Sequence, residues 1–414
     1  MTFHKKVEFV IAPGFESGTY SLEVSCSLSY LKYVRKMEKV KFKDTFNFQK
    51  KSKIKAGDGL KLNEGEYPFY TSSNILTKSL NEFLFDEESL IFGTGGLASI
   101  HHCNEKFAVS TDCFVTQPKN KNDVFSKYVY YYLSGNMHIL ENGFKGAGLK
   151  HISKDYLEKI EIPLPNLTTQ KRIAAILDKA EALKQYNQQL IKKYDALTQS
   201  LFLDMFGDPV KNEKKFKLKK LKDGIVNLQS GLSLSGEERL LKNDEIAVLK
   251  ISAVTSGVFI SSEHKVVVKS DIKKTIIFPK KGDLLFSRAN TKEKVGAVAI
   301  VDQDYDNLFI PDKLWRIDTN QLLNRIFLKF VLSHKGFRYN IEKVSTGTSG
   351  SMLNISMPKF LKIEAPFPPI ELQNQFAERV QQIELQKQQA QEALQKSEQL
   401  FNGLLQQAFK GELN

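Results

Sequence analysis

The sequence predicts an α+β fold built twice: two β-rich domains separated by two long antiparallel, coiled-coil-like helices. The segment KIEIPLPNLTTQ, which begins at Lys159, returns 203 residues later as KIEAPFPPIELQ, which begins at Lys362. The match continues without a gap through two long polar-rich segments and pairs Ala174 with Ala377. Apolar residues in both segments recur at heptad spacing, and turn-punctuated β-rich sequence precedes each of them. A period this long indicates duplicated domains with pseudo-two-fold symmetry rather than a solenoid.

The repeat divides the 414 residues into five segments. The first copy has its β-rich domain at 37–165 and its helix at 166–206. The second copy has its domain at 207–368 and its helix at 369–414. Residues 1–36 have no counterpart in the second half and form an amino-terminal extension.

Short apolar runs between turn sequences predict the strands of each β-rich domain. In the first copy, Leu90-Ile91-Phe92 and Phe114-Val115 are expected strands, and a helix is expected from about Ser126 to Leu140. In the second copy, Leu284-Leu285-Phe286 mirrors the first strand, and a helix is expected over Leu323 to Tyr339. The loops between these elements differ in length, because Asp312 follows its counterpart Asp112 by 200 residues rather than 203.

The two long helices are expected to pair with each other. Their apolar residues follow two adjoining tracks of period seven, the a/d pattern of a coiled coil. The predicted helix–helix interface comprises Ile173, Ile176, Leu183, Leu190, Leu197, Leu201, Phe376, Ile383, Leu394, Phe401 and Leu404. A helix from about Thr169 to Phe206 would be roughly 55 Å long, which is longer than one small domain requires. An alternative is that each stripe covers only its neighbouring domain.

Composition favours a globular protein with a polyanionic partner. Hydrophobic residues make up 41% of the chain, enough for two cores, and the formal net charge is +13. The lysines cluster at residues 50–55 and 211–222. A solvated, solubilising surface is the alternative interpretation of each cluster.

Nothing in the sequence predicts export or membrane insertion. No apolar run approaches the roughly 20 residues that a membrane helix needs, and the first residues lack the pattern of a signal peptide. Three cysteines do not suit a disulfide framework. We therefore expect a cytoplasmic protein without membrane contact.

The repeated segments resemble a known family. Each copy has Pro-x-Pro followed after four residues by Gln at the start of the long helix, at 163–170 and 366–373. Further marks are the segment Gly65 to Ser72, the Leu-Ile-Phe-Gly turn at 90–93 and the terminal Phe409 to Leu413. This combination resembles the specificity (S) subunit of Type I restriction-modification systems. The family's helix-start motif often has Glu before Gln, where this chain has Thr169 and Leu372.

The resemblance implies a subunit that reads DNA without catalysing a reaction. Two target-recognition domains would each bind half of a split double-stranded DNA target, and the helices would fix the spacer between the halves. Two modification (methyltransferase) subunits would dock on the helices, and restriction subunits are expected to join them. The chain itself would bind no cofactor, because S-adenosylmethionine, ATP and Mg serve the partner subunits, and no metal site is expected in it.

Candidate DNA-binding residues follow from side-chain chemistry. Phosphate contacts are expected from lysines in and near glycine-rich loops: Lys50, Lys51, Lys53, Lys145, Lys150, Lys292 and Lys294. Arg288 and Asn290, in a loop after a strand, have the donors that recognise guanine and adenine. The matching loop of the first copy, 94–97, has no such side chains, so Tyr70, Ser72, Ser73 and Asn74 are its candidates. A solvated loop is the alternative for each residue.

The main rival hypothesis is a DNA-modifying enzyme, either a methyltransferase or a nuclease, with its own site. Phe367-Pro368-Pro369-Ile370 lacks the amide or carboxylate and the stacking aromatic of an amino-methyltransferase motif. The glycine loops at 93–96 and 143–150 have the wrong spacing for dinucleotide and phosphate-binding motifs. His101, His102, Cys103 and Cys113 raise the possibility of zinc, but a packed strand and turn is favoured. A scaffold that binds only proteins is a third hypothesis.

Overall fold

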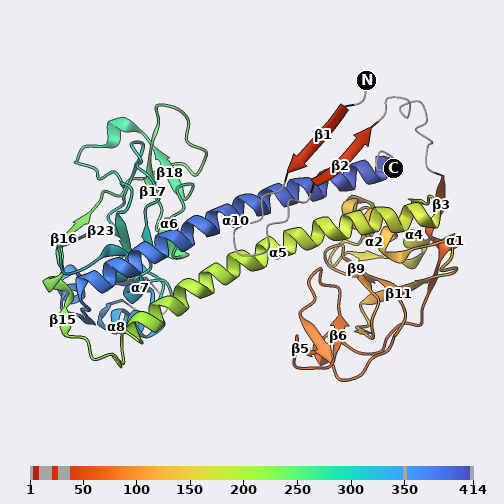
Figure 1. The fold of residues 1–414 in the computed structure, drawn as a ribbon, viewed down its shortest axis with the longest axis horizontal. Coiled ribbons are helices and arrows are strands. Elements are labelled where there is room, and N and C mark those ends of the chain that lie inside the picture. Colours follow the sequence, from red (N-terminus) through yellow and green to blue (C-terminus); the bar gives the residue numbers. More distant parts are fainter. Residues whose placement is uncertain (1–2, 9–20, 27–37, 348–351, 411–414) are drawn as a thin grey trace. The chain divides into compact units, whose positions relative to one another are not determined.

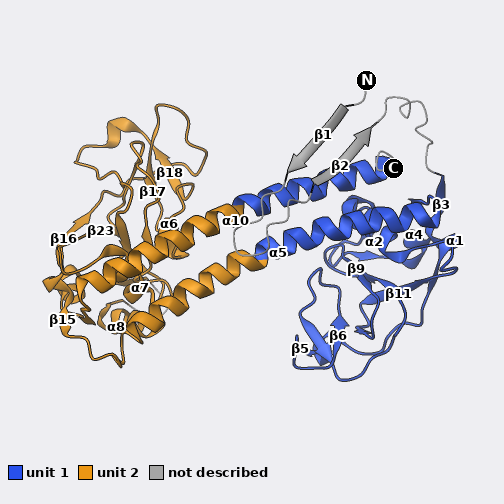
Figure 2. Cartoon of the chain, viewed as in Figure 1, with its two compact units in different colours: residues 1–188, 392–414 blue, residues 189–391 orange. Residues whose placement is uncertain are grey.

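The computed structural model describes residues 3–8, 21–26, 38–347 and 352–410, and the chain divides into two compact units. Unit 1 comprises residues 1–188 and 392–414, and unit 2 comprises residues 189–391 (Figure 2). Each unit contains one β-rich domain and a part of each long helix. Helices and strands are mixed in both units, which confirms the predicted α+β class (Figure 1).

Unit 1 contains two four-stranded sheets. One of them is an antiparallel sheet with the strand order β4 (Phe46–Phe48), β11 (Cys113–Pro118), β8 (Ser89–Gly93), β9 (Ile100–Cys103). The other sheet has the order β10 (Ala108–Val109), β6 (Tyr67–Tyr70), β7 (Lys78–Leu80), β5 (Leu60–Lys61), and β10 lies parallel to β6. Three further antiparallel pairs are β1 (Phe3–Glu8) with β2 (Ser21–Cys26), β3 (Lys39–Lys41) with β14 (Glu161–Pro163), and β12 (Phe144–Lys145) with β13 (His151–Ile152). Its short helices are α1 (Phe42–Thr45), η2 (Ala56–Asp58), α2 (Ser126–Gly135), α3 (Met137–Glu141) and α4 (Lys154–Lys159).

Unit 2 repeats this plan. Its four-stranded antiparallel sheet has the order β16 (Ile225–Ser230), β23 (Leu314–Thr319), β19 (Leu284–Ser287), β21 (Val298–Ile300). A three-stranded sheet, β18 (His264–Val267), β17 (Ile246–Leu249), β22 (Leu308–Phe309), again contains one parallel pair, β17 with β22. The pair β15 (Leu218–Lys220) with β25 (Glu364–Pro366) matches β3 with β14. The pair β20 (Ala289–Asn290) with β24 (Leu353–Asn354) stands where unit 1 has a single bridge between Gly95 and His151. Its short helices are η3 (Leu221–Asp223), α6 (Ser252–Thr255), η4 (Lys269–Asp271), α7 (Arg325–Ser333), α8 (Lys335–Val344) and α9 (Met357–Leu361).

The predicted strands are confirmed as β8, β11 and β19, but each predicted domain helix is broken in two. In unit 1 the break falls at Asn136, which has φ −129° and ψ 48° and donates its side-chain amide to Tyr132 O at 2.9 Å. In unit 2 the break falls at His334, whose backbone is extended, and the second helix runs five residues past the expected end. The predictions of unbroken helices were therefore wrong: at Asn136 a side-chain bond to the preceding turn accompanies the break, and at His334 an extended residue separates the two helices.

The two long helices form as predicted and pair within each unit. Helix α5 spans Leu167–Phe206 and α10 spans Ile370–Lys410. In unit 1 the first part of α5 meets the last part of α10, where Lys184 Nζ lies 4.8 Å from the centre of the Phe401 ring. In unit 2 the last part of α5 meets the first part of α10, where the Phe202 and Phe376 rings lie 5.7 Å apart. The helices are therefore antiparallel.

The predicted interface residues differ widely in burial. Ile173 and Phe376 are 2% and 0% exposed and belong to the cores of their units, whereas Leu183 and Leu197 are 37% and 50% exposed. The remaining residues are partly buried: Ile176, Leu190, Leu201, Ile383, Leu394, Phe401 and Leu404. Leu183 and Leu197, which lie on the same heptad track of α5, are thus open to solvent, so the interior of the pair is narrower than the sequence pattern suggests.

A glutamine repeated in both copies fastens each long helix to its domain. Gln170 Oε1 accepts from Phe125 N at 2.8 Å, while its Nε2 donates to Asp123 O and Pro165 O. Gln373 makes the same three bonds, to Asn324 N, Leu322 O and Pro368 O. Both side chains are fully buried. The Pro-x-Pro-x4-Gln motif is therefore a joint between the start of the long helix and the start of α2 or α7.

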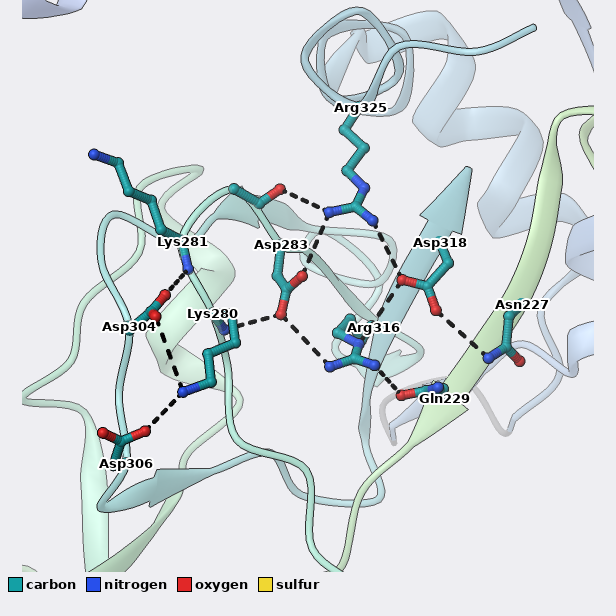
Figure 3. A network of polar contacts seen from close by, with 11 residues as sticks. Asn227, Gln229, Lys280, Lys281, Asp283, Asp304, Asp306, Arg316, Asp318 and Arg325 are labelled. Carbon is teal, nitrogen blue, oxygen red and sulfur yellow. Dashed lines mark hydrogen bonds and ion pairs between the residues drawn. The ribbon is translucent and has the colours of Figure 1, made fainter. Parts of the chain in front are cut away.

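Unit 2 also carries a network of charged groups between its sheet and α7 (Figure 3). Arg325 donates to Asp283 and Asp318, both at 3.4 Å, and to the carbonyl of Gly282. Arg316 lies 3.8 Å from Asp283 and also donates to Gln229 on β16. The Asp283 side chain is only 9% exposed, so the two guanidinium groups compensate a nearly buried carboxylate.

Candidate nucleic-acid interface

Four segments of unit 1 meet at one end of its antiparallel sheet and form tip 1, which comprises residues 72–74, 94–97, 111–112 and 145–152. Thr94 N donates to Asp112 O at 2.9 Å, and Ser72 Oγ donates to the same carbonyl at 3.0 Å. Ile152 N donates to Thr94 O at 3.1 Å. At Gly93, which leads into the tip, a Cβ atom would lie 2.2 Å from Ser99 Oγ, so a larger residue could not take this position without a shift.

Unit 2 has an equivalent tip 2, which comprises residues 230–233, 288–294, 311–313, 346–347 and 352–355. Ser230 Oγ donates to Asp312 O at 2.9 Å, as Ser72 does to Asp112. Ile355 N donates to Arg288 O at 2.9 Å, as Ile152 does to Thr94. The two tips therefore share the backbone bond of the isoleucine and a serine bonded to the turn carbonyl of Asp112 or Asp312. The serines come from different strands, because Ser72 follows β6 and Ser230 ends β16, and the loop that starts at Arg288 is longer than the one that starts at Thr94.

The structure gathers the candidate lysines on and beside the tips. Lys145 and Lys150 are exposed within tip 1, and Lys292 and Lys294 are exposed within tip 2. Lys50, Lys51 and Lys53 are exposed on a segment that is joined to tip 1 by the bond from Thr111 N to Ile54 O at 2.8 Å. Lys292 Nζ lies 3.2 Å from Glu342 Oε1 in an exposed ion pair, which a phosphate could displace at little cost. Their role in phosphate contact stays a prediction.

The polar candidates of tip 1 differ in accessibility. Ser73 and Asn74 are exposed, and Ser72 is partly buried because it bonds to Asp112. Tyr70 is only 8% exposed and packs with Phe107 in the core, and burial raises the pKa of its phenol far above the ordinary value. The exposed pair Ser73 and Asn74 is thus better placed than Tyr70 for base contact, which stays a prediction for all four residues.

In tip 2 the two candidate base readers are held in place by their own chain. Arg288 Nε donates to Asp312 O at 2.8 Å, and its terminal nitrogen lies 3.3 Å from Asp312 Oδ2. Asn290 is 9% exposed, donates to Ser287 Oγ and accepts from Thr291 N. The side chain of Arg288 is 28% exposed, which leaves part of its guanidinium open to a ligand. Base readout by either residue stays a prediction.

The sequence interpretation overlooked apolar residues that the tips expose. Leu97 and Leu149 in tip 1 are 81% and 70% exposed, and Met352 in tip 2 is 40% exposed. A large apolar residue next to a glycine-rich turn was a signal for them, because such a turn offers little for it to pack against. The candidates predicted from the sequence were all polar or basic.

The histidines and cysteines of the possible zinc site have separate partners. His102 Nε2 lies 2.8 Å from Glu88 Oε1, whereas His101 Nε2 lies 2.8 Å from Ser73 O. Burial raises the pKa of the Cys113 thiol to about 11. Over the described ranges, no three His, Cys, Asp or Glu residues are grouped so that they could hold a metal ion.

No helix in those ranges has the length and apolar character to span a membrane.

Comparisons with known proteins agree with this architecture. The family model described as the Type I restriction modification DNA specificity domain matches the chain twice, at residues 35–193 and 213–398. The specificity subunit of the Type I restriction enzyme MjaVIII from Methanocaldococcus jannaschii is 26% identical over 78% of this chain and 80% of its own length. The EcoKI specificity subunit of Escherichia coli is 23% identical over 77% of this chain and 72% of its own length. The crystal structure of a Type I S subunit from M. genitalium covers 92% of this chain and 98% of its own, with 16% identity and a TM-score of 0.63.

The chain contains two copies of a β-rich domain followed by a long helix, and each domain carries a tip rimmed by lysines. This arrangement defines a duplicated DNA-specificity protein. Both halves of the chain match the same family model, and together the matches cover most of its length. The chain belongs to the Type I restriction-modification DNA specificity family.

Proposed function

We propose that this chain is the specificity subunit of a Type I modification complex, in which tip 1 and tip 2 each bind one half of a bipartite DNA target. The observation that carries the proposal is the repeated tip, in which Ile152 and Ile355 make the same backbone bond, to Thr94 and Arg288. Because the side chains presented on the two equivalent frames differ, the two half-sites differ in sequence.

Exposed apolar side chains along α5 support docking of modification subunits. Leu183 and Tyr186 are 37% and 49% exposed in unit 1, and Leu197 is 50% exposed in unit 2. Exposed apolar residues repeated along one helix are typical of protein interfaces. Two modification subunits bind here, and restriction subunits join the complex through them.

The chemistry belongs to the partners in this proposal. The modification subunits bind S-adenosylmethionine, and the restriction subunits use ATP and Mg. The purified chain alone should transfer no methyl group to DNA, which isothermal titration with S-adenosylmethionine and a methylation assay will test. Methylation of DNA by the chain without partners would favour the rival hypothesis of a DNA-modifying enzyme.

Reconstitution of the complex tests the proposal directly. The chain is co-expressed with the modification subunit of its host, and plasmid DNA from these cells is sequenced by a method that detects methylated bases. We expect one bipartite motif with two different halves and a fixed spacer. Methylation without such a motif, or without dependence on this chain, would contradict the proposal.

The helices set the spacer length in this proposal. Four residues inserted after Gln188 and four after its repeat counterpart Gln391 lengthen both helices at the boundary between the units. The insertion adds roughly 6 Å and a rotation of about 40°, which suits one or two further base pairs at about 3.4 Å each. The methylated motif should keep both halves and gain that spacer. An unchanged spacer would refute the ruler while leaving DNA binding intact.

A further inference from the structure

Each tip exposes a large apolar side chain at the same position of the repeat. Leu149 and Met352 lie three residues before Ile152 and Ile355, whose amides bond to the matching carbonyls of Thr94 and Arg288. Leu149 is 70% exposed and Met352 is 40% exposed. Single exposed apolar residues are common on protein surfaces, but exposure at the same repeat position in both tips points to a ligand with an apolar group.

Both residues are held by backbone bonds of the tip. Gly96 N donates to the carbonyl of Lys150, the residue that follows Leu149. A Cβ atom on Gly95 would lie 3.8 Å from Leu149 Cδ2. In tip 2, Thr346 and Asn354 exchange two backbone bonds of 2.7 and 2.8 Å beside Met352. The apolar groups therefore lie beside hydrogen-bonded backbone in tips that expose lysines, which favours a surface that faces a polyanion.

The apolar feature of DNA that such a side chain can recognise in the major groove is the C5-methyl group of thymine. Insertion between base pairs is the other known use of leucine and methionine at DNA. Insertion requires a side chain that projects freely, but Met352 is only 40% exposed, and because Leu149 holds the matching repeat position, the same kind of contact is assigned to it. Contact with a methyl group at the edge of a base needs no such projection.

We propose that Leu149 and Met352 read thymine through its C5-methyl group, one residue in each half of the target. The inference rests on the proposed function and extends it from a DNA-binding tip to a particular group on a particular base. It gives tip 1 a means of recognising an A·T base pair through an apolar contact, because the loop 94–97 has no arginine or amide side chain.

The test uses the reconstituted modification complex and duplexes that carry its target, determined as described above. Each thymine of the two half-sites is replaced in turn by deoxyuridine, which lacks only the methyl group. At one thymine per half-site, we expect affinity to fall by about three- to five-fold, the effect of one buried methyl group. Fluorescence anisotropy measures the dissociation constants.

Variants assign the effect to a residue through a double cycle. Leu149→Ala should weaken binding by a similar factor, and deoxyuridine in the contacted half-site should then add no further loss; Met352→Ala should do the same for the other half-site. Leu149→Met should retain most of the methyl discrimination. Val226→Ala is the matched control, because Val226 is 63% exposed at the opposite end of β16 from Ser230 and should change nothing.

Several outcomes would overturn the inference. One is that deoxyuridine has no effect on affinity at any thymine. Another is that the losses of affinity from deoxyuridine and from the alanine variants multiply independently. The third is a rise in 2-aminopurine fluorescence that depends on Leu149 and reports insertion between bases. A wild-type complex that shows no preference for the target would instead count against the proposed function itself.

Discussion

Units 1 and 2 build the same frame but fasten its interior with different chemistry. In unit 2, Arg325 at the start of α7 bonds to Asp283 on the sheet side. The equivalent positions of unit 1 hold Ser126 and Ser89, and Val115 stands where unit 2 has Arg316. By contrast, the joint made by Gln170 recurs bond for bond. Connections that position the helices are repeated, whereas the packing behind the sheet has diverged.

The largest effect is expected at the two glutamine joints and should be equal in both units. Gln170→Ala or Gln373→Ala leaves one buried amide and two carbonyls without their partners, and we expect a loss of about 3 kcal/mol in the free energy of unfolding of the affected unit. Urea denaturation followed by hydrogen exchange on α2 and α7 measures it. Gln382→Ala, at an exposed position of α10, is the control and should stay within about 0.5 kcal/mol. Unequal losses would break the equivalence of the joints.

The charged network should make the two units respond oppositely at matching positions. Arg325→Ala leaves Asp283 with Arg316 as its only guanidinium partner, beside the backbone amide of Lys280, and we expect unit 2 to lose about 2 kcal/mol of stability. Ser126→Ala removes a buried hydroxyl that has no hydrogen-bond partner among the described residues, so unit 1 should be unchanged or slightly more stable. Thermal unfolding of both variants provides the comparison. Equal destabilisation by the two substitutions would contradict it.

Lys329 should be a residue whose removal stabilises the protein. It lines a groove of about 1740 Å³ in unit 2, at the position that Tyr130 occupies in unit 1. Burial lowers its pKa below the ordinary 10.5, so the folded state holds its ammonium at a cost that is full below the folded pKa and declines as pH rises from there toward 10.5. Lys329→Met should therefore raise the Tm by roughly 2–4 °C at pH 7. The advantage should shrink toward pH 10, and a lower Tm at pH 7 would refute this assignment.

The smallest effect concerns acid and should fall on unit 1. Burial lowers the pKa of His101 despite its bond to Ser73 O, whereas unit 2 has Ala299 at the matching position. Below the ordinary pKa of 6.5 the unfolded chain binds a proton that the folded chain resists, so stability falls as pH decreases. We expect unit 1 to lose up to about 1 kcal/mol between pH 7 and pH 5. His101→Gln should abolish this dependence, and its persistence in that variant would place the titration elsewhere.

The sequence predicted those features that the repeat itself encodes. The heptad tracks gave α5 and α10, and the apolar runs gave β8 and β19, because such patterns report burial directly. The breaks at Asn136 and His334 were missed, since each is a single residue with non-helical backbone angles, which periodicity does not record. At the tips, the sequence located the loops around Arg288 and Lys150 but not the burial of Tyr70 and Asn290, which arises from strands distant in sequence.

Exchange of one recognition domain tests the central claim most directly. Residues 218–366 are replaced by a second copy of residues 39–163, so that the splice points fall on the matching strand pairs β3 with β14 and β15 with β25. If each tip reads one half of the target, sequencing of methylated DNA will show the half-site of tip 1 twice, as an inverted repeat around the spacer. A folded complex that methylates the original asymmetric motif would contradict the account.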